Sequence, residues 1–139
     1  MTTTACGPSA STSRARSSWE ALSSALAVPP ADLVVVLDDV ALELGTIRVR
    51  ERGGHGNHNG LRSIIELLGS EDFPRVRLGI RKGEPPEDLA GYVLSEFPQE
   101  DVLVVQEAVG EAADAVEALL RDGAAAAMNR YNGPRPFTP

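Results

Sequence analysis

The stretch Gly53-Gly54-His55-Gly56-Asn57-His58-Asn59-Gly60-Leu61-Arg62-Ser63-Ile64 separates two kinds of hydrophobic pattern. Before it, residues 46–50 alternate between apolar and basic side chains, which predicts a β-strand. After it, leucines and isoleucines follow helical spacing as far as Gly69. We therefore expect a helix that begins near Asn59 and ends at this glycine, and a strand, a loop and a helix in succession favour an α/β protein.

The flanking segments extend this pattern in both directions. The run Leu33-Val34-Val35-Val36-Leu37 is short, apolar and β-branched, which predicts a strand covered on both faces in a parallel or mixed sheet. Residues 75–80 alternate again, so this strand and the one at residues 46–50 should each turn arginines to one face and bury apolar residues on the other. The residues expected to be buried on these two strands are Ile47, Val49, Val76, Leu78 and Ile80.

Two further helices are expected in the C-terminal half. One lies within residues 86–97, and a longer one spans residues 99–121. The apolar face of the longer helix would consist of Val102, Val105, Val109, Ala112, Val116 and Leu119. A weaker helical pattern covers residues 18–26, before Pro29-Pro30.

With 139 residues, the chain has the length of one domain. Residues 1–17 have the composition of a disordered tail or an organellar transit segment, residues 18–131 form the expected domain, and residues 132–139 resemble a loose tail. The longest apolar run is far too short to span a membrane. The single cysteine, Cys6, cannot form an internal disulfide. We expect a cytoplasmic protein, or a chloroplast or mitochondrial one if the tail directs transit.

The charge is unevenly distributed along the chain. The net charge is −7, but eight of the 13 basic residues lie between positions 48 and 82, while residues 84–122 carry eleven acids and one base, Arg121. Clustered positive charge favours phosphate ligands, so the middle of the chain is the candidate nucleic-acid interface. An ordinary solvated sheet face is the alternative interpretation of the arginines.

Asp38 is expected directly after a buried strand, where ligands bind in open α/β sheets, although aspartate is also common there as a turn residue. The glycine-rich stretch offers free N–H groups at a helix start to an anion or oxyanion. Asn59 is either the helix N-cap or a substrate ligand, and spacing alone favours the cap. A metal site made by Asp38, His55 and His58 lacks an evident fourth ligand. Attack by water, with a histidine base oriented by a carboxylate, stays open.

These residues resemble a known family. Two segments are similar in residue types and spacing to bacterial-type peptidyl-tRNA hydrolases. They are the stretch from Gly53 to Ile64 and the run Asp72-Phe73-Pro74-Arg75-Val76-Arg77-Leu78-Gly79-Ile80. The strand ending in Asp38-Asp39 and the segment Gly91-Tyr92-Val93-Leu94-Ser95-Glu96-Phe97 resemble further parts of this family. The resemblance runs from about Ser18 to Tyr131. It implies a single α/β domain with a twisted mixed sheet flanked by helices.

The resemblance also implies an activity, which is cleavage of the ester that joins a peptide to the tRNA 3′ end. The implied partner is tRNA, and the implied reaction uses no cofactor or metal. Asp38 would match the carboxylate that orients the catalytic histidine, and Asn59 would match the asparagine that binds the peptide–tRNA end. His58, Gly56 and Gly54 would belong to the same substrate-binding loop. The residues that would bind tRNA phosphate are Arg50 and Arg75, with Arg48 and Arg77 beside them.

The sequence departs from this family at its N-terminal end. Nothing in residues 1–31 resembles the family's opening Gly-Asn-Pro strand or its Thr-Arg-His-Asn motif, whose histidine is the general base. We therefore expect an N-terminally truncated member with impaired hydrolysis. The loss of the general base should lower the rate of hydrolysis by about 10²-fold to 10⁴-fold or more. Family members are monomers, and exposed sheet edges would favour self-association here. The alternative function is a non-catalytic RNA-binding protein of the same fold, such as an organellar intron-splicing factor.

Overall fold

The computed structural model describes residues 29–133. The expected N-terminal tail, the helix expected at residues 18–26 and the end of the expected C-terminal tail lie outside these described residues. The elements in chain order are η1 (Pro30–Asp32), β1 (Val35–Glu43), β2 (Ile47–Arg50), α2 (Asn59–Leu68), β3 (Arg75–Arg81), α3 (Leu89–Leu94), η2 (Gln99–Asp101), α4 (Val102–Asp122) and α5 (Ala124–Tyr131).

The three strands form one mixed sheet in the order β1-β3-β2. β1 runs parallel to β3, and β2 pairs with β3 in the antiparallel direction. β1 is longer than expected, because it continues through Asp38 and Asp39 to Glu43, with an irregularity in its register between Asp39 and Glu43. Asp38 therefore lies within β1, near the end of its regular pairing with β3, and does not follow the strand.

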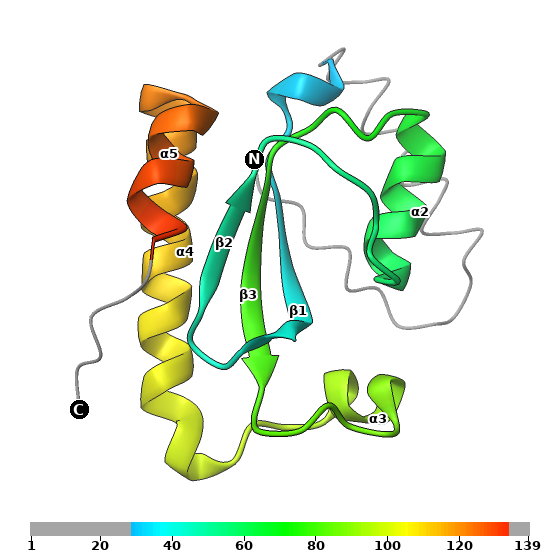
Figure 1. Cartoon of the computed structure of the whole chain (residues 1–139), viewed down its shortest axis with the longest axis vertical. Helices are drawn as coiled ribbons and strands as arrows, with labels where there is room; N and C mark the ends of the chain where they lie inside the picture. The colour runs from blue at the N-terminus through cyan, green and yellow to red at the C-terminus, as the bar shows by residue number, and fades with distance from the viewer. Residues whose placement is uncertain (1–28, 134–139) are drawn as a thin grey trace.

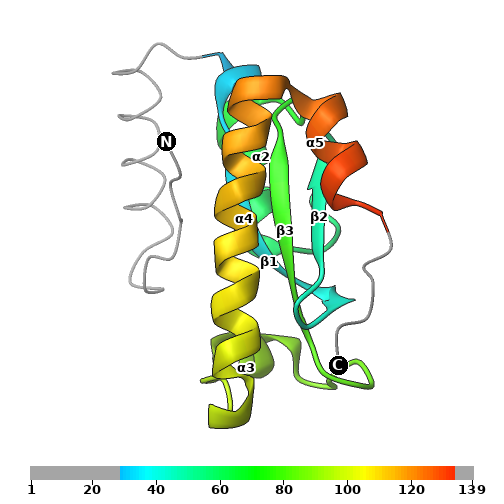
Figure 2. The same cartoon turned by 90° about the vertical axis from the view of Figure 1, so that its left-hand side faces the viewer.

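Helices cover both faces of the sheet, which confirms the α/β fold expected from the sequence (Figure 1). On one face α4 and α5 pack against Ile47, Val49 and Val76, and Figure 2 shows α4 in front of the sheet, running along the direction of the strands. On the other face, Val35 and Leu37 of β1 pack against α2 and the buried Phe73; the α2 residues in this cluster are Leu61 and Ile64. Alternate residues of β1 thus enter two different core clusters, as its continuous apolar sequence predicts.

The expected apolar face of α4 is only partly correct. Its buried residues are Ala108, Ala112, Ala115, Ala118 and Leu119. Val102 and Val109, which were expected to be buried, are 38% and 54% exposed. Alanine lets a helix approach its neighbours closely, and α4 packs against both the sheet and α5.

α5 is an element that the sequence pattern did not predict. It follows α4 after Gly123, whose φ of 89° is costly for other residues. Asn132, which we assigned to a loose tail, is hydrogen-bonded to β2 instead. Within residues 29–133 no helix is both long enough and apolar enough to cross a membrane.

Candidate active site and basic face

Asp38 and His58 form a hydrogen-bonded pair between β1 and the start of α2. Nε2 of His58 lies 3.1 Å from Oδ1 of Asp38. The other ring nitrogen of His58, Nδ1, accepts the backbone N–H group of Leu61 at 3.0 Å. His58 is thus the N-cap of α2, and the expectation that Asn59 is the cap is wrong. The imidazole can approach the helix start because residue 60 is glycine, where a Cβ atom would lie 3.1 Å from Cε1 of His58.

These two contacts define which nitrogen of His58 carries the proton. Because Nδ1 accepts a hydrogen bond, it holds a lone pair, so the proton of the neutral ring resides on Nε2. Nε2–H then donates to the carboxylate of Asp38. The hydrogen bond from His58 lowers the pKa of Asp38 below its ordinary value, against the opposing effect of burial, and the charge of His58 when protonated adds to the lowering. Asp38 is therefore ionised at neutral pH.

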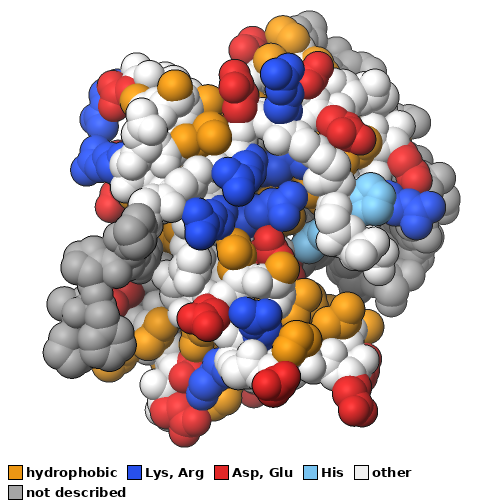
Figure 3. All heavy atoms as spheres, in the orientation of Figure 1, with side chains coloured by type: hydrophobic (Ala, Val, Ile, Leu, Met, Phe, Trp, Pro, Cys, Tyr) orange, Lys and Arg blue, Asp and Glu red, His pale blue; other side chains and the backbone are white. Residues whose placement is uncertain are grey.

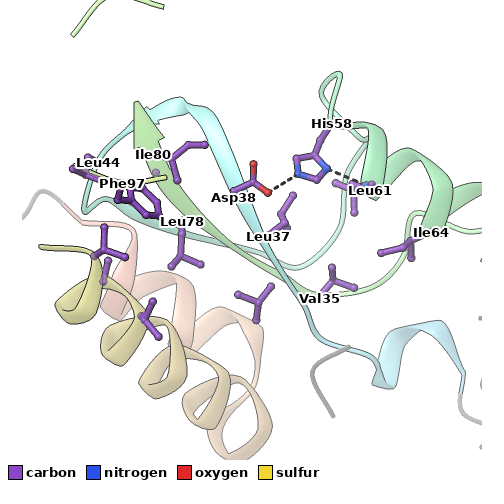
Figure 4. Close-up of a pocket in the computed structure, with 16 residues that line it drawn as sticks. Val35, Leu37, Asp38, Leu44, His58, Leu61, Ile64, Leu78, Ile80 and Phe97 are labelled. Carbon is purple, nitrogen blue, oxygen red and sulfur yellow. Dashed lines mark hydrogen bonds and ion pairs between the residues drawn. The ribbon is translucent and has the colours of Figure 1, made fainter. Parts of the chain in front are cut away.

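A cavity of about 260 Å³ opens beside this pair (Figure 4). Most of its wall is apolar and comes from β1, β3, α2 and α4, with Leu44 and Phe97 at the end away from His58. Asp38 and His58 are the charged and titratable side chains in its lining. An apolar cavity with few polar groups at one place is typical of a small-ligand site.

The glycine-rich loop lies between β2 and α2. Asn57 and Gly56 have φ values of 64° and 53°, and the N–H group of His58 donates to the carbonyl of His55, so the chain turns sharply just before the helix. Asn59 is the first residue of α2 and is exposed to solvent. Within the described residues its amide is therefore accessible from solvent.

The position of the Arg75 side chain differs from the prediction made from the sequence. It was expected to grip phosphate, but its side chain is fully buried. Its guanidinium donates to the carbonyl groups of Gly54, Glu71 and Phe73, at 2.8 to 3.4 Å, and lies 4.3 Å from the centre of the Phe73 ring. Burial, together with the nearby charge of Arg77, lowers the pKa of Arg75. Arg75 holds the glycine-rich loop in place and does not reach a ligand in this arrangement.

The other three arginines lie on one face of the sheet. Figure 3 shows basic side chains gathered on this face beside the histidines. The register sets Arg48 opposite Arg77, and Arg50 opposite Arg75, so that like charges face each other across β2 and β3. Such pairs are destabilising unless another group offsets them. Arg77 is offset by Asp39 at 3.2 Å, whereas Arg50 is exposed. We call Arg48, Arg50 and Arg77 the basic face.

Arg77 also connects the basic face to the loop. Its Nη1 atom lies 3.2 Å from Oδ2 of Asp39, and its Nη2 atom lies 3.4 Å from the carbonyl oxygen of Gly54. Asp39 follows Asp38 directly in β1. Adjacent residues of a strand point to opposite faces, so the loop is what joins the two sites: it contacts Arg77 through Gly54 and Asp38 through His58.

The metal site considered for Asp38, His55 and His58 finds no support in the geometry. Both ring nitrogens of His58 are already engaged, and Nδ1 of His55 accepts the N–H group of Asn57 at 3.1 Å. In the part of the chain that the structure describes, no three histidine, cysteine or acidic side chains come close enough to hold an ion.

Two contacts of the basic face were not expected from the sequence. One is the ion pair of Asp39 with Arg77, and the other is the contact of Arg48 with the carbonyl group of Asn132. Strand alternation could have indicated the first, because Asp39 lies two residues from Leu37 and shares its face. No periodic pattern indicates the second, which joins residues 84 positions apart.

The fold and the site define a class: an α/β domain in which a glycine-rich loop joins an acid–histidine pair on a parallel strand to an arginine-lined sheet face. The family model described as peptidyl-tRNA hydrolase matches residues 8–138. The chain belongs to the peptidyl-tRNA hydrolase family.

Curated relatives agree with this assignment. A peptidyl-tRNA hydrolase of Roseiflexus sp. (strain RS-1) is 52% identical over 108 residues, which cover 78% of this chain and 50% of that protein. One from Thermoanaerobacter sp. (strain X514) is 46% identical over 120 residues, which cover 84% of this chain and 64% of that protein. The chain thus spans between half and two thirds of the length of these relatives.

Solved structures agree as well. A crystal structure of peptidyl-tRNA hydrolase from Acinetobacter baumannii superimposes with a TM-score of 0.73 at 30% sequence identity. The match covers 84% of this chain and 59% of the other. The mixed α/β fold expected from the resemblance is therefore confirmed.

Proposed function

We propose that this chain binds peptidyl-tRNA and acts on the ester that joins the peptide to the tRNA 3′ end. One observation carries the proposal: Arg77 joins the basic face to the glycine-rich loop and to Asp39, the neighbour of Asp38. A phosphate backbone bound on the basic face would then lie beside the loop, whose His58 contacts Asp38. The names of the curated relatives support the same substrate.

In this proposal each group has a defined task. Arg48, Arg50 and Arg77 bind phosphate oxygens, which would offset the like charges that face each other on the sheet. The amide of Asn59, exposed at the start of α2, binds the peptide–tRNA end. Ionised Asp38 orients an imidazole through its carboxylate.

Hydrolysis requires water to add to the ester carbonyl carbon and to give up a proton, while the bond to the ribose oxygen breaks and that oxygen takes a proton. His58 is poorly suited to take the proton from water. Its Nδ1 lone pair is used by the Leu61 N–H group, and its Nε2 already carries a proton donated to Asp38. We therefore propose that the described residues supply substrate binding and carboxylate orientation, and that hydrolysis by this chain is slow.

The occupied nitrogens of His58 favour one second candidate, an RNA-binding protein without catalysis. Such a protein would use the same basic face and would bind structured RNA whether or not an ester is present. The two candidates differ in the importance of Asn59, because only the first requires its amide.

Both candidates can be tested with the purified chain, uncharged tRNA and an N-acetylated aminoacyl-tRNA. We expect tRNA binding that weakens with salt, and slow release of the N-acetylated amino acid. Asn59→Ala should reduce this release by at least about 10-fold and leave the affinity for uncharged tRNA nearly unchanged. Release at an ordinary enzymatic turnover, about 1 s⁻¹ or faster, would contradict the slow hydrolysis. Binding without any release would favour the second candidate.

A pair of arginine variants serves as the control for binding. Arg50→Ala removes an exposed charge from the basic face, whereas Arg121→Ala removes one from α4, which packs on the opposite face of the sheet. We expect Arg50→Ala to lower the slope of log affinity against log salt by about one and Arg121→Ala to leave it unchanged. Equal slopes for both variants would rule out the basic face as the binding surface.

A further inference from the structure

Asn132 lies at the open edge of β2. Its Oδ1 atom accepts the backbone N–H group of Val49 at 2.7 Å, and its Nδ2 atom donates to the Val49 carbonyl at 2.8 Å. Within the described residues β2 pairs with β3 alone, so these bonds lie on its other side. One carboxamide therefore satisfies both backbone groups of an edge residue, as a neighbouring strand would.

The backbone of Asn132 makes a second contact at the same place. Its carbonyl accepts a hydrogen bond from Nη1 of Arg48 at 2.8 Å. Arg48 and Val49 are adjacent in β2, so their side chains point to opposite faces of the sheet. Because the Asn132 side chain is anchored to the Val49 backbone, the carbonyl that meets Arg48 is fixed relative to the strand.

The acceptor is neutral, and this distinguishes Arg48 from its cross-strand neighbour. Arg77 donates to the carboxylate of Asp39, which offsets its charge. Arg48 is held by a carbonyl oxygen, so its guanidinium is oriented while its full positive charge remains available to an anion. An arginine that is already ordered loses less side-chain entropy when it binds a phosphate.

We propose that Asn132 is a positioning residue for the basic face, which holds the Arg48 guanidinium in place for an RNA phosphate. The proposal rests on the proposed function, since it requires that RNA binds to this face. It assigns a role to the residue that follows α5, outside the loop and strands that carry the resemblance.

A double-mutant cycle on the full chain tests the proposal, with tRNA binding measured by fluorescence anisotropy at several salt concentrations. The variants are Asn132→Ala, Arg48→Ala and the double variant. We expect each single variant to weaken binding about 3-fold to 10-fold and to lower the salt slope. The double variant should bind no more weakly than Arg48→Ala, because Asn132 acts through Arg48.

Asn129→Ala is the matched control, since Asn129 is an exposed asparagine of α5. It should leave the affinity and the slope unchanged. If Asn132→Ala does not fold, Asn132→Ser replaces it, because the serine hydroxyl can still accept the Val49 N–H group.

Three outcomes would overturn the proposal, and they are distinguishable. If Asn132→Ala lowers the melting temperature but keeps the affinity and the salt slope, its role is only structural. If the losses from the two single variants multiply in the double variant, Asn132 does not act through Arg48. If the unmodified chain does not bind tRNA, the proposed function fails and this proposal fails with it.

Discussion

Nε2 of His58 lies 3.1 Å from Oδ1 of Asp38, while Nδ1 of the same ring accepts the Leu61 N–H group. One imidazole thus connects the middle of β1 to the first turn of α2. The same side chain keeps Asp38 oriented and satisfies a backbone group that would otherwise lack a partner at the helix start. Its role in stability and its role at the site can be separated by substitution.

The first prediction concerns pH. The pKa of Asp38 lies below its ordinary value of 3.8, chiefly because His58 donates a hydrogen bond to it. Ionised Asp38 therefore stabilises the fold at pH values above 3.8, and this contribution is lost as the pH falls through the lowered pKa of the folded state. In urea unfolding between pH 6 and pH 2, the native chain should lose more stability on acidification than Asp38→Asn. Parallel curves for the two proteins would contradict this account.

The second prediction separates the two bonds of His58. His58→Ala removes the N-cap and should lower the free energy of unfolding by about 1 kcal/mol. His58→Asn should restore most of this loss, because asparagine is a good N-cap, but its shorter side chain is not expected to reach Asp38. Chemical denaturation of both variants measures the difference. If His58→Asn is as unstable as His58→Ala, the contact with Asp38 contributes more than the cap.

The sequence predicted the strands and α2 well, because apolar alternation and helical spacing depend on local burial. Gly69, for example, ends α2 in the left-handed conformation with a φ of 65°. The roles of individual polar residues were less predictable. The sequence cannot show that His58 reaches both Asp38 and the Leu61 N–H group, or that Arg75 is enclosed by three carbonyl groups, because these contacts depend on how the loop folds over the sheet.

The C-terminal end shows the same limit. α4 was expected to bury its valines, but the helix turns its alanines inward to pack closely against α5 and the sheet. Without α5, which the pattern did not indicate, this preference could not be foreseen. The contact of Asn132 with β2 depends on α5 in turn.

The third prediction compares two arginines that face each other across the sheet, Arg50 and Arg75. Arg75→Ala leaves buried carbonyl groups without a donor and should cost at least about 2 kcal/mol of stability. Arg50→Ala removes an exposed side chain and should change stability by less than about 0.5 kcal/mol. Denaturant unfolding measures both values. Similar small effects for the two variants would show that Arg75 is not required to hold the loop.

The fourth prediction concerns the close approach of β3 to the irregular end of β1. A Cβ atom at Gly79 would lie 2.0 Å from the carbonyl oxygen of Glu43 and 2.8 Å from its carbonyl carbon, so backbone would have to move. Gly79→Ala should therefore destabilise the chain by about 1 to 3 kcal/mol or more and disturb the nearby Asp39 and Asp38.

Gly110→Ala is the matched control, because Gly110 is an exposed residue within α4 and a Cβ atom there meets nothing within 4 Å. This variant should be stabilised by about 0.5 to 1 kcal/mol, since alanine favours the helix. Thermal unfolding of both variants gives the comparison. The signs should be opposite, and a Gly79→Ala variant as stable as the native chain would mean that the irregular end of β1 yields easily. In that case Asp38 would not be held rigidly by the strand, and its orientation would depend on His58 alone.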